Sequence, residues 1–66
     1  MRLLTDRERE IFSLLIDGME TKEISDFLFI SEKTVRNHIS NVMQKLGVKS
    51  RSQAIIELLK LNIIKL

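Results

Sequence analysis

The sequence predicts an all-α fold, and three features of its 66 residues lead to that prediction. Proline is absent and glycine occurs only twice, so little interrupts a helix. Hydrophobic residues recur at spacings of three and four, the pattern of helices with one buried side. A threonine or serine stands at the start of four such stretches, where its hydroxyl can cap a helix. Because the chain is short, we expect residues 1–66 to form a single four-helix domain.

The first two helices are predicted at residues 6–17 and 22–29. Thr5 and Glu8 have the spacing of a capping box, and Gly18 can take the left-handed conformation that ends a helix. Thr21 is the expected N-cap of the second helix. Its inner side would be formed by Ile24, Phe27 and Leu28.

The third and fourth helices are predicted at residues 32–46 and 51–61. Ser31 caps the third helix directly after the second helix ends, so the connection between them is only a few residues long. Gly47 ends the third helix. Ser50 and Gln53 form a second capping box, and the inner side of the fourth helix consists of Ala54, Ile55, Leu58, Leu59 and Leu61.

Composition excludes several classes of function. The chain has no cysteine and one histidine, which leaves no thiolate metal site or disulfide and too few ligands for a histidine-based metal site. We find no catalytic acid–base pair and no glycine-rich phosphate loop, so we expect no enzyme, no cofactor and no metal. No apolar run is long enough for a membrane span and no signal peptide is visible, which favours a cytoplasmic location without a membrane partner.

The net charge of +2 is unevenly distributed along the chain. Residues 32–51 contain five basic residues and one acidic residue, a net charge of +4, whereas residues 1–31 contain four basic and seven acidic residues, a net charge of −3. Such an asymmetry is typical of a nucleic-acid surface. A solvated helix face would produce the same pattern.

The polar side of the third helix is the most informative feature. On a helical wheel, Lys33, Asn37, Ser40 and Gln44 lie opposite the apolar stripe, and Arg36 flanks them. Arginine and asparagine carry paired hydrogen-bonding groups that match the edges of purine bases. A short turn followed by such a helix indicates a helix-turn-helix DNA-binding arrangement. The alternative is a helical protein-interaction or adaptor module whose polar side is merely solvated.

The chain also resembles a known family, the LuxR-type helix-turn-helix domain. The resemblance covers residues 3 to about 60 without gaps and is carried by residues 4–11, 21–24, 31–41 and 45–54. It implies a transcription regulator that binds double-stranded promoter DNA as a dimer, with RNA polymerase as a further candidate partner. Within the family, the chain is most similar to a small sporulation factor that consists of this domain alone, which implies a role in sporulation.

The resemblance also assigns individual contacts. Its base-reading positions are Arg36, Asn37 and Ser40. Its DNA-backbone positions are Thr21, Lys22, Lys33, Thr34, Lys49, Ser50 and Arg51. To these we add Lys45, which lies at the edge of the polar side. For Arg36 the alternative is a phosphate contact, and for Ser40 it is a hydrogen bond to its own helix backbone.

Two features depart from the family pattern. Met1 stands directly before the first helix, so we expect no receiver or signal-binding domain ahead of it. Met19 and Glu20 replace the small polar residues that are usual before the second helix. A carboxylate at this position opposes phosphate binding.

The C-terminal stretch carries more apolar residues than one small core can cover. Ile56, Leu59, Ile63 and Ile64 are therefore predicted to form a homodimer interface through the fourth helix. A twofold dimer would place two third helices about 34–36 Å apart on a pseudo-palindromic site. The alternative is that the C-terminal residues fold back onto their own core.

Overall fold

Four helices make up the structure, a computed structural model that describes residues 2–66: α1 (Asp6–Ile16), α2 (Thr21–Leu28), α3 (Glu32–Leu46) and α4 (Arg51–Lys60). Residues 2–66 contain no β-strand, which confirms the predicted all-α, four-helix fold. Each helix end lies within one residue of its predicted position. Met1, on which the expectation of no preceding domain depends, lies outside the described residues.

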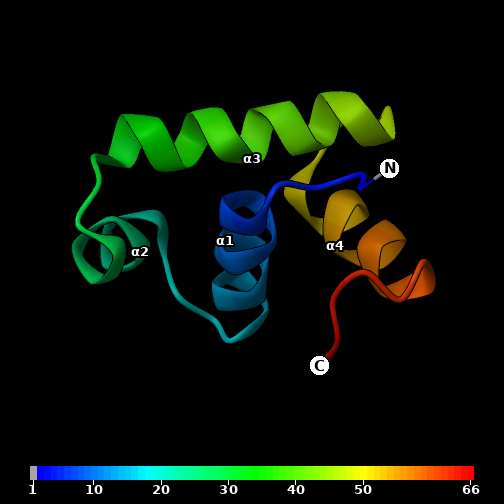
Figure 1. The fold of residues 1–66 in the computed structure, drawn as a ribbon, viewed down its shortest axis with the longest axis horizontal. Helices are drawn as coiled ribbons and strands as arrows, with labels where there is room; N and C mark the ends of the chain where they lie inside the picture. Colours follow the sequence, from blue (N-terminus) through cyan, green and yellow to red (C-terminus); the bar gives the residue numbers. More distant parts are fainter. Residues whose placement is uncertain (1) are drawn as a thin grey trace.

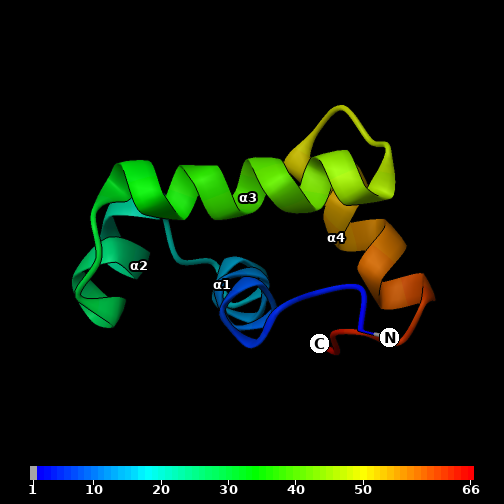
Figure 2. The same cartoon turned by 45° about the horizontal axis from the view of Figure 1, so that its top comes forward.

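Helix α3 is the central element of the fold. It packs against α1, α2 and α4, and Figure 1 shows it lying along one side of the molecule with the other three helices beneath it. The described chain measures 28 × 23 × 22 Å along its principal axes. The turn between α2 and α3 lies at one end of the long axis, and α4 lies toward the other end (Figures 1 and 2).

Three of the four helix starts have the predicted caps. The Glu8 amide donates to Thr5 Oγ1 at 3.1 Å, and the Thr5 amide donates to the Glu8 carboxylate at 2.9 Å, which completes the capping box. Ser31 and Ser50 accept from the amide three residues later, at 3.0 and 3.1 Å. These bonds satisfy amides that a helix leaves without partners in its first turn.

Helix α2 begins differently from the prediction. Its N-cap is Glu20, whose amide donates to the Glu23 carboxylate at 2.8 Å, and Thr21 is the first helical residue. A carboxylate at the third helical position can satisfy the amide before the helix, so the threonine is not required as a cap. The Thr21 hydroxyl is thereby left for a contact outside its own helix.

The core consists of side chains from all four helices. Phe12, Ile24, Val35 and Leu58 are fully buried in it, each from a different helix. Two residues predicted on inner sides are exposed: Phe27 by 61% and Leu61 by 51%. Leu61 follows the last residue of α4, so the helical spacing no longer applies to it. In α2, Ser25 is buried while Phe27 points outward.

The segment after α4 turns back onto the molecule. Asn62 has a φ of +58°, and the Ile63 amide donates to the Leu58 carbonyl at 3.0 Å. This turn directs Ile64 into the core, where only 4% of it is exposed. The predicted dimer contact at Ile64 is therefore wrong, because the side chain is already covered by its own chain.

Candidate nucleic-acid interface

The outer side of α3 is polar and exposed, as the helical wheel predicts. Lys33, Arg36, Asn37, Ser40 and Gln44 are all exposed there. Within residues 2–66, the Ser40 hydroxyl makes no hydrogen bond to its own helix, which was the alternative role for it. About three turns of helix thus present hydrogen-bond donors and acceptors to solvent in a continuous row.

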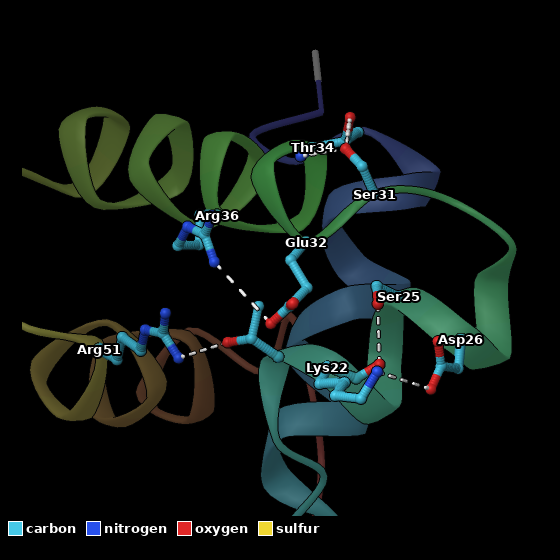
Figure 3. Close-up of polar contacts among 9 residues, drawn as sticks. Lys22, Ser25, Asp26, Ser31, Glu32, Thr34, Arg36 and Arg51 are labelled. Atoms are coloured by element: carbon cyan, nitrogen blue, oxygen red, sulfur yellow. Dashed lines mark hydrogen bonds and ion pairs between the residues drawn. The ribbon is translucent and has the colours of Figure 1, made fainter.

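Arg36 lies at the edge of this row. Its Nη1 atom is 3.9 Å from Glu32 Oε1, and both side chains are about half exposed (Figure 3). Lys22 and Asp26 on α2 form a similar exposed pair, also at 3.9 Å. Exposed ion pairs of this length contribute little to stability. Both cations are therefore available to exchange their carboxylate partner for a ligand.

The start of α4 contacts the start of α2 on the Arg36 side of α3. Arg51 Nη1 donates to Thr21 Oγ1 at 3.2 Å, across 30 residues of sequence. Figure 3 shows Arg51 reaching from α4 to the start of α2, and Arg36 on α3 pointing toward Glu32. Helix starts favour bound anions, since their first amides and the helix dipole are both positive. The fold thus joins the starts of α2 and α4 through Arg51, while Arg36 is exposed on α3 beside Glu32.

The other residues predicted to contact the DNA backbone differ in exposure and in the hydrogen bonds that they already make within the protein. Lys33, Lys49 and Ser50 are exposed, although the Ser50 hydroxyl accepts from the Gln53 amide. Thr34 is half-buried, and its hydroxyl accepts a bond of 2.9 Å from the Ser31 hydroxyl. Glu20 is exposed directly before Thr21, so the unfavourable charge that the sequence indicates is present at the start of α2.

Lys45 has a different environment from the other cations. Its Nζ atom is 2.5 Å from Glu8 Oε1, and Glu8 is only 3% exposed. We assign Lys45 to this contact between α1 and α3, where it neutralises a buried carboxylate, rather than to a phosphate. No local sequence pattern indicates this pair, because the two residues are 37 positions apart and the spacing of Glu8 is explained by the capping box.

The pKa of Glu8 reflects these contacts. Burial raises the pKa of the carboxyl group, because the charged form loses its hydration. The hydrogen bond and positive charge of Lys45, together with the amide and hydroxyl of Thr5, act in the opposite direction. Their combined effect is larger and lowers the pKa of Glu8 below its ordinary value of 4.5. The carboxylate is thus ionised and fully partnered within the fold.

The predicted dimer surface is smaller in the structure than expected. Ile56 is 52% exposed, whereas Leu59 and Ile63 are half-buried against the core. Leu61, predicted on the inner side, adds an exposed apolar side chain at the end of α4. Ile64 contributes nothing to this surface.

Residues 2–66 contain no helix that is both long and apolar enough to cross a membrane.

Comparison with known proteins identifies the family. Residues 2–58 match the family model described as bacterial regulatory proteins, luxR family. The spore germination protein GerE of Bacillus subtilis (strain 168) is 67% identical over 64 residues, which cover 97% of this chain and 86% of that protein. The transcriptional regulatory protein DegU of Brevibacillus brevis is 47% identical over 91% of this chain, which spans only 25% of its length.

Solved structures give the same assignment. The structure of the transcription factor GerE superposes with a TM-score of 0.91 at 68% identity, over 94% of this chain and 92% of that one. The response regulator ChrA of a heme-sensing two-component system superposes with a TM-score of 0.89 at 36% identity, over 97% of this chain and 32% of that one. The resemblance predicted from the sequence motifs is confirmed. The chain belongs to the luxR family of bacterial regulatory proteins, and it is a regulator and not an enzyme.

Proposed function

We propose that this chain regulates transcription by binding promoter DNA sequence-specifically, with α3 in the major groove. The observation that supports this proposal is that α3 has an exposed polar side and that the starts of α2 and α4 are joined by a hydrogen bond. Relatives are described as transcriptional regulatory proteins, and one of them, DevR/DosR of Mycobacterium tuberculosis, as a DNA-binding transcriptional activator. The major groove of B-DNA is wide enough to admit a helix such as α3.

Arg36 and Asn37 are the proposed base-reading residues, with Ser40 as a third. The arginine guanidinium can donate two bonds to guanine, and the asparagine amide can pair with adenine. The phosphate contacts are assigned to Thr21, Lys22, Lys33, Thr34, Lys49, Ser50 and Arg51, which orient the protein without reading sequence. When Thr21 accepts from Arg51, its own hydroxyl hydrogen remains available for a phosphate oxygen.

The proposed regulator binds as a twofold dimer through α4. Ile56, Leu59 and Leu61 supply the apolar contacts, and Ile63 lies at their edge. This arrangement requires a pseudo-palindromic site with half-sites about 34–36 Å apart. The regulated genes are assigned to sporulation or germination, because the 67% identical relative is named a spore germination protein. The site of action is the bacterial cytoplasm, with RNA polymerase as a further partner.

Selection of binding sites from random DNA duplexes tests the proposal. We expect a pseudo-palindromic motif, and an affinity whose logarithm falls with log salt by about 0.9 per neutralised phosphate. Sedimentation of the protein with the selected duplex should show two chains per site. Absence of duplex binding at low salt would refute DNA readout and favour the alternative of a protein-interaction module. One chain per selected site would refute the dimer alone.

A further inference from the structure

The carboxylate of Glu32 stands at the beginning of the helix that is proposed to enter the major groove. Glu32 is the first residue of α3 and the only acidic residue among positions 32–56, a stretch that contains five basic residues. Its side chain is about half exposed, and Oε1 lies 3.9 Å from Arg36 Nη1 (Figure 3). A carboxylate at this place is repelled by DNA phosphates. Its presence beside a proposed base-reading arginine therefore needs an explanation.

Capping of the helix does not supply that explanation. The carboxylates of Glu8 and Glu23 accept a hydrogen bond from the amide that precedes their own helix, at 2.9 and 2.8 Å. Within residues 2–66, Glu32 makes no bond of this kind. The start of α3 is capped by Ser31, whose hydroxyl accepts from the amide three residues later at 3.0 Å. The carboxylate of Glu32 is thus available to a donor outside its own helix.

The geometry of the pair fits two neighbouring base pairs. Glu32 and Arg36 are four residues apart, so their side chains lie on the same side of α3. The first residues of a helix in the major groove are the ones that contact base edges. Successive base pairs of B-DNA are about 3.4 Å apart, which is close to the 3.9 Å between the charged atoms. If Arg36 contacts one base pair, Glu32 can therefore contact the next.

The chemistry of a carboxylate selects the base. A carboxylate has acceptor atoms and no donor. In the major groove guanine and thymine present acceptors, adenine presents a donor beside an acceptor, and cytosine presents its amino group as a donor alone. Cytosine is therefore the base whose edge a carboxylate matches without facing an acceptor.

We propose that Glu32 is a specificity-determining residue that reads a cytosine in the base pair beside the one that Arg36 contacts. The inference rests on the proposed function and adds one base to the sequence that α3 reads. On other sequences the carboxylate finds no donor and still repels the phosphates, so incorrect sites are disfavoured. Specific interfaces commonly combine attraction to the correct partner with such repulsion from the others.

The substitution Glu32→Gln tests the proposal, because a glutamine amide matches adenine instead of cytosine. Binding sites are selected from random duplexes with the original chain and with the variant. We expect one base position to change from cytosine to adenine and the other positions to stay the same. Fluorescence anisotropy then compares two duplexes that differ only at this base pair. The original chain should prefer cytosine by about fivefold or more, Glu32→Gln should reverse the order, and Glu32→Ala should prefer neither.

The matched control is Asp26→Asn. It removes the carboxylate from the exposed pair with Lys22 on α2, in which the charged atoms are also 3.9 Å apart, and it should leave every base preference unchanged. A changed preference in the control would attribute the effect to loss of an ion pair and overturn the proposal. Identical base preferences for the original chain and Glu32→Gln would also overturn it, and would leave Glu32 as a favourable charge at the helix start. Failure of the original chain to bind any duplex would refute the proposed function, and this inference with it.

Discussion

The two edges of α3 carry similar cations with different roles. On the edge that faces α1, Lys45 lies 2.5 Å from Glu8, a carboxylate that is almost completely buried. On the edge that faces the starts of α2 and α4, Arg36 lies 3.9 Å from the exposed Glu32. A buried partner fixes a cation in place, because leaving either charge alone inside the protein is unfavourable. A solvated partner leaves the cation free to meet a ligand.

Replacement of Arg36 should affect DNA recognition most. We expect Arg36→Ala to weaken binding to the selected site by about 1–3 kcal/mol, because a bidentate base contact is lost. Binding to random duplex should weaken much less, and the melting temperature should stay nearly unchanged. Fluorescence anisotropy with both duplexes measures the difference. Equal losses on the two duplexes would make Arg36 a phosphate contact.

Replacement of Glu8 should lower stability, because Glu8 contacts Lys45 on the edge of α3 that faces α1. Glu8→Ala removes the contact with Lys45 and half of the capping box, and we expect it to lower the free energy of unfolding by about 2 kcal/mol. For a domain of this size that corresponds to a fall in melting temperature of roughly 10 °C. Thermal unfolding followed by circular dichroism checks this result. Glu10→Ala, which removes a carboxylate from an exposed ion pair on the same helix, serves as the control and should have little effect.

The salt dependence of DNA binding separates the lysines. We expect Lys49→Ala to reduce the slope of log affinity against log salt by about 0.9, the share of one phosphate contact. Lys45→Ala should leave the slope unchanged and lower stability instead. A reduced slope for Lys45→Ala would return that residue to the DNA interface.

The stability of the Glu8 contact should depend on pH in acid. The pKa of Glu8 is lowered in the folded chain, so its contribution is complete above the ordinary value of 4.5 and is lost as pH falls through the lowered value. The difference in unfolding free energy between the original chain and Glu8→Gln should thus be constant near neutral pH and shrink in acid. Urea unfolding across this range measures it. A difference that grows in acid would contradict the assigned direction.

The smallest expected effect on stability comes from Glu32. Glu32→Gln removes the exposed partner of Arg36, and we expect a loss of stability of about 0.3–0.5 kcal/mol or less. Affinity for random duplex should rise, since one carboxylate near the phosphates disappears. Glu57→Gln removes a carboxylate from α4 instead. It tests whether the gain in affinity for random duplex requires a position on the proposed interface. A loss of several kcal/mol in stability would show that the two edges of α3 are alike.

Sequence patterns were sufficient to predict the parts of the structure that are determined by contacts between residues close in sequence. The capping box at Thr5, the serine caps at Ser31 and Ser50, and both glycines act within a few residues, so their spacing predicts the helix boundaries that they set. The second predicted capping box is incomplete, because the Gln53 side chain accepts from the Lys49 amide and not from the Ser50 amide. The exposed polar side of α3 follows from helical periodicity in the same way. The family resemblance supplied the base-reading and phosphate assignments, which remain predictions.

Long-range packing accounts for what the sequence did not reveal. Glu8 and Lys45 are 37 residues apart, and no local rule pairs them. Ile64 enters the core only because Asn62 turns the chain after α4. Phe27 has the right spacing for an inner position, but the buried residues of α2 are Ile24 and Ser25. In each case a contact between distant elements determines whether a side chain is buried or paired, which helical periodicity alone does not show.

The hydrogen bond between Arg51 and Thr21 has a kinetic consequence. It joins the starts of two helices before any ligand arrives, at a distance of 3.2 Å. A surface that is already assembled requires no rearrangement after collision with DNA, so the encounter itself sets the association rate. Encounters between opposite charges accelerate steeply as ionic strength falls. The association rate constant should therefore carry much of the salt dependence of binding, and the dissociation rate constant should mainly report the base contacts proposed for α3.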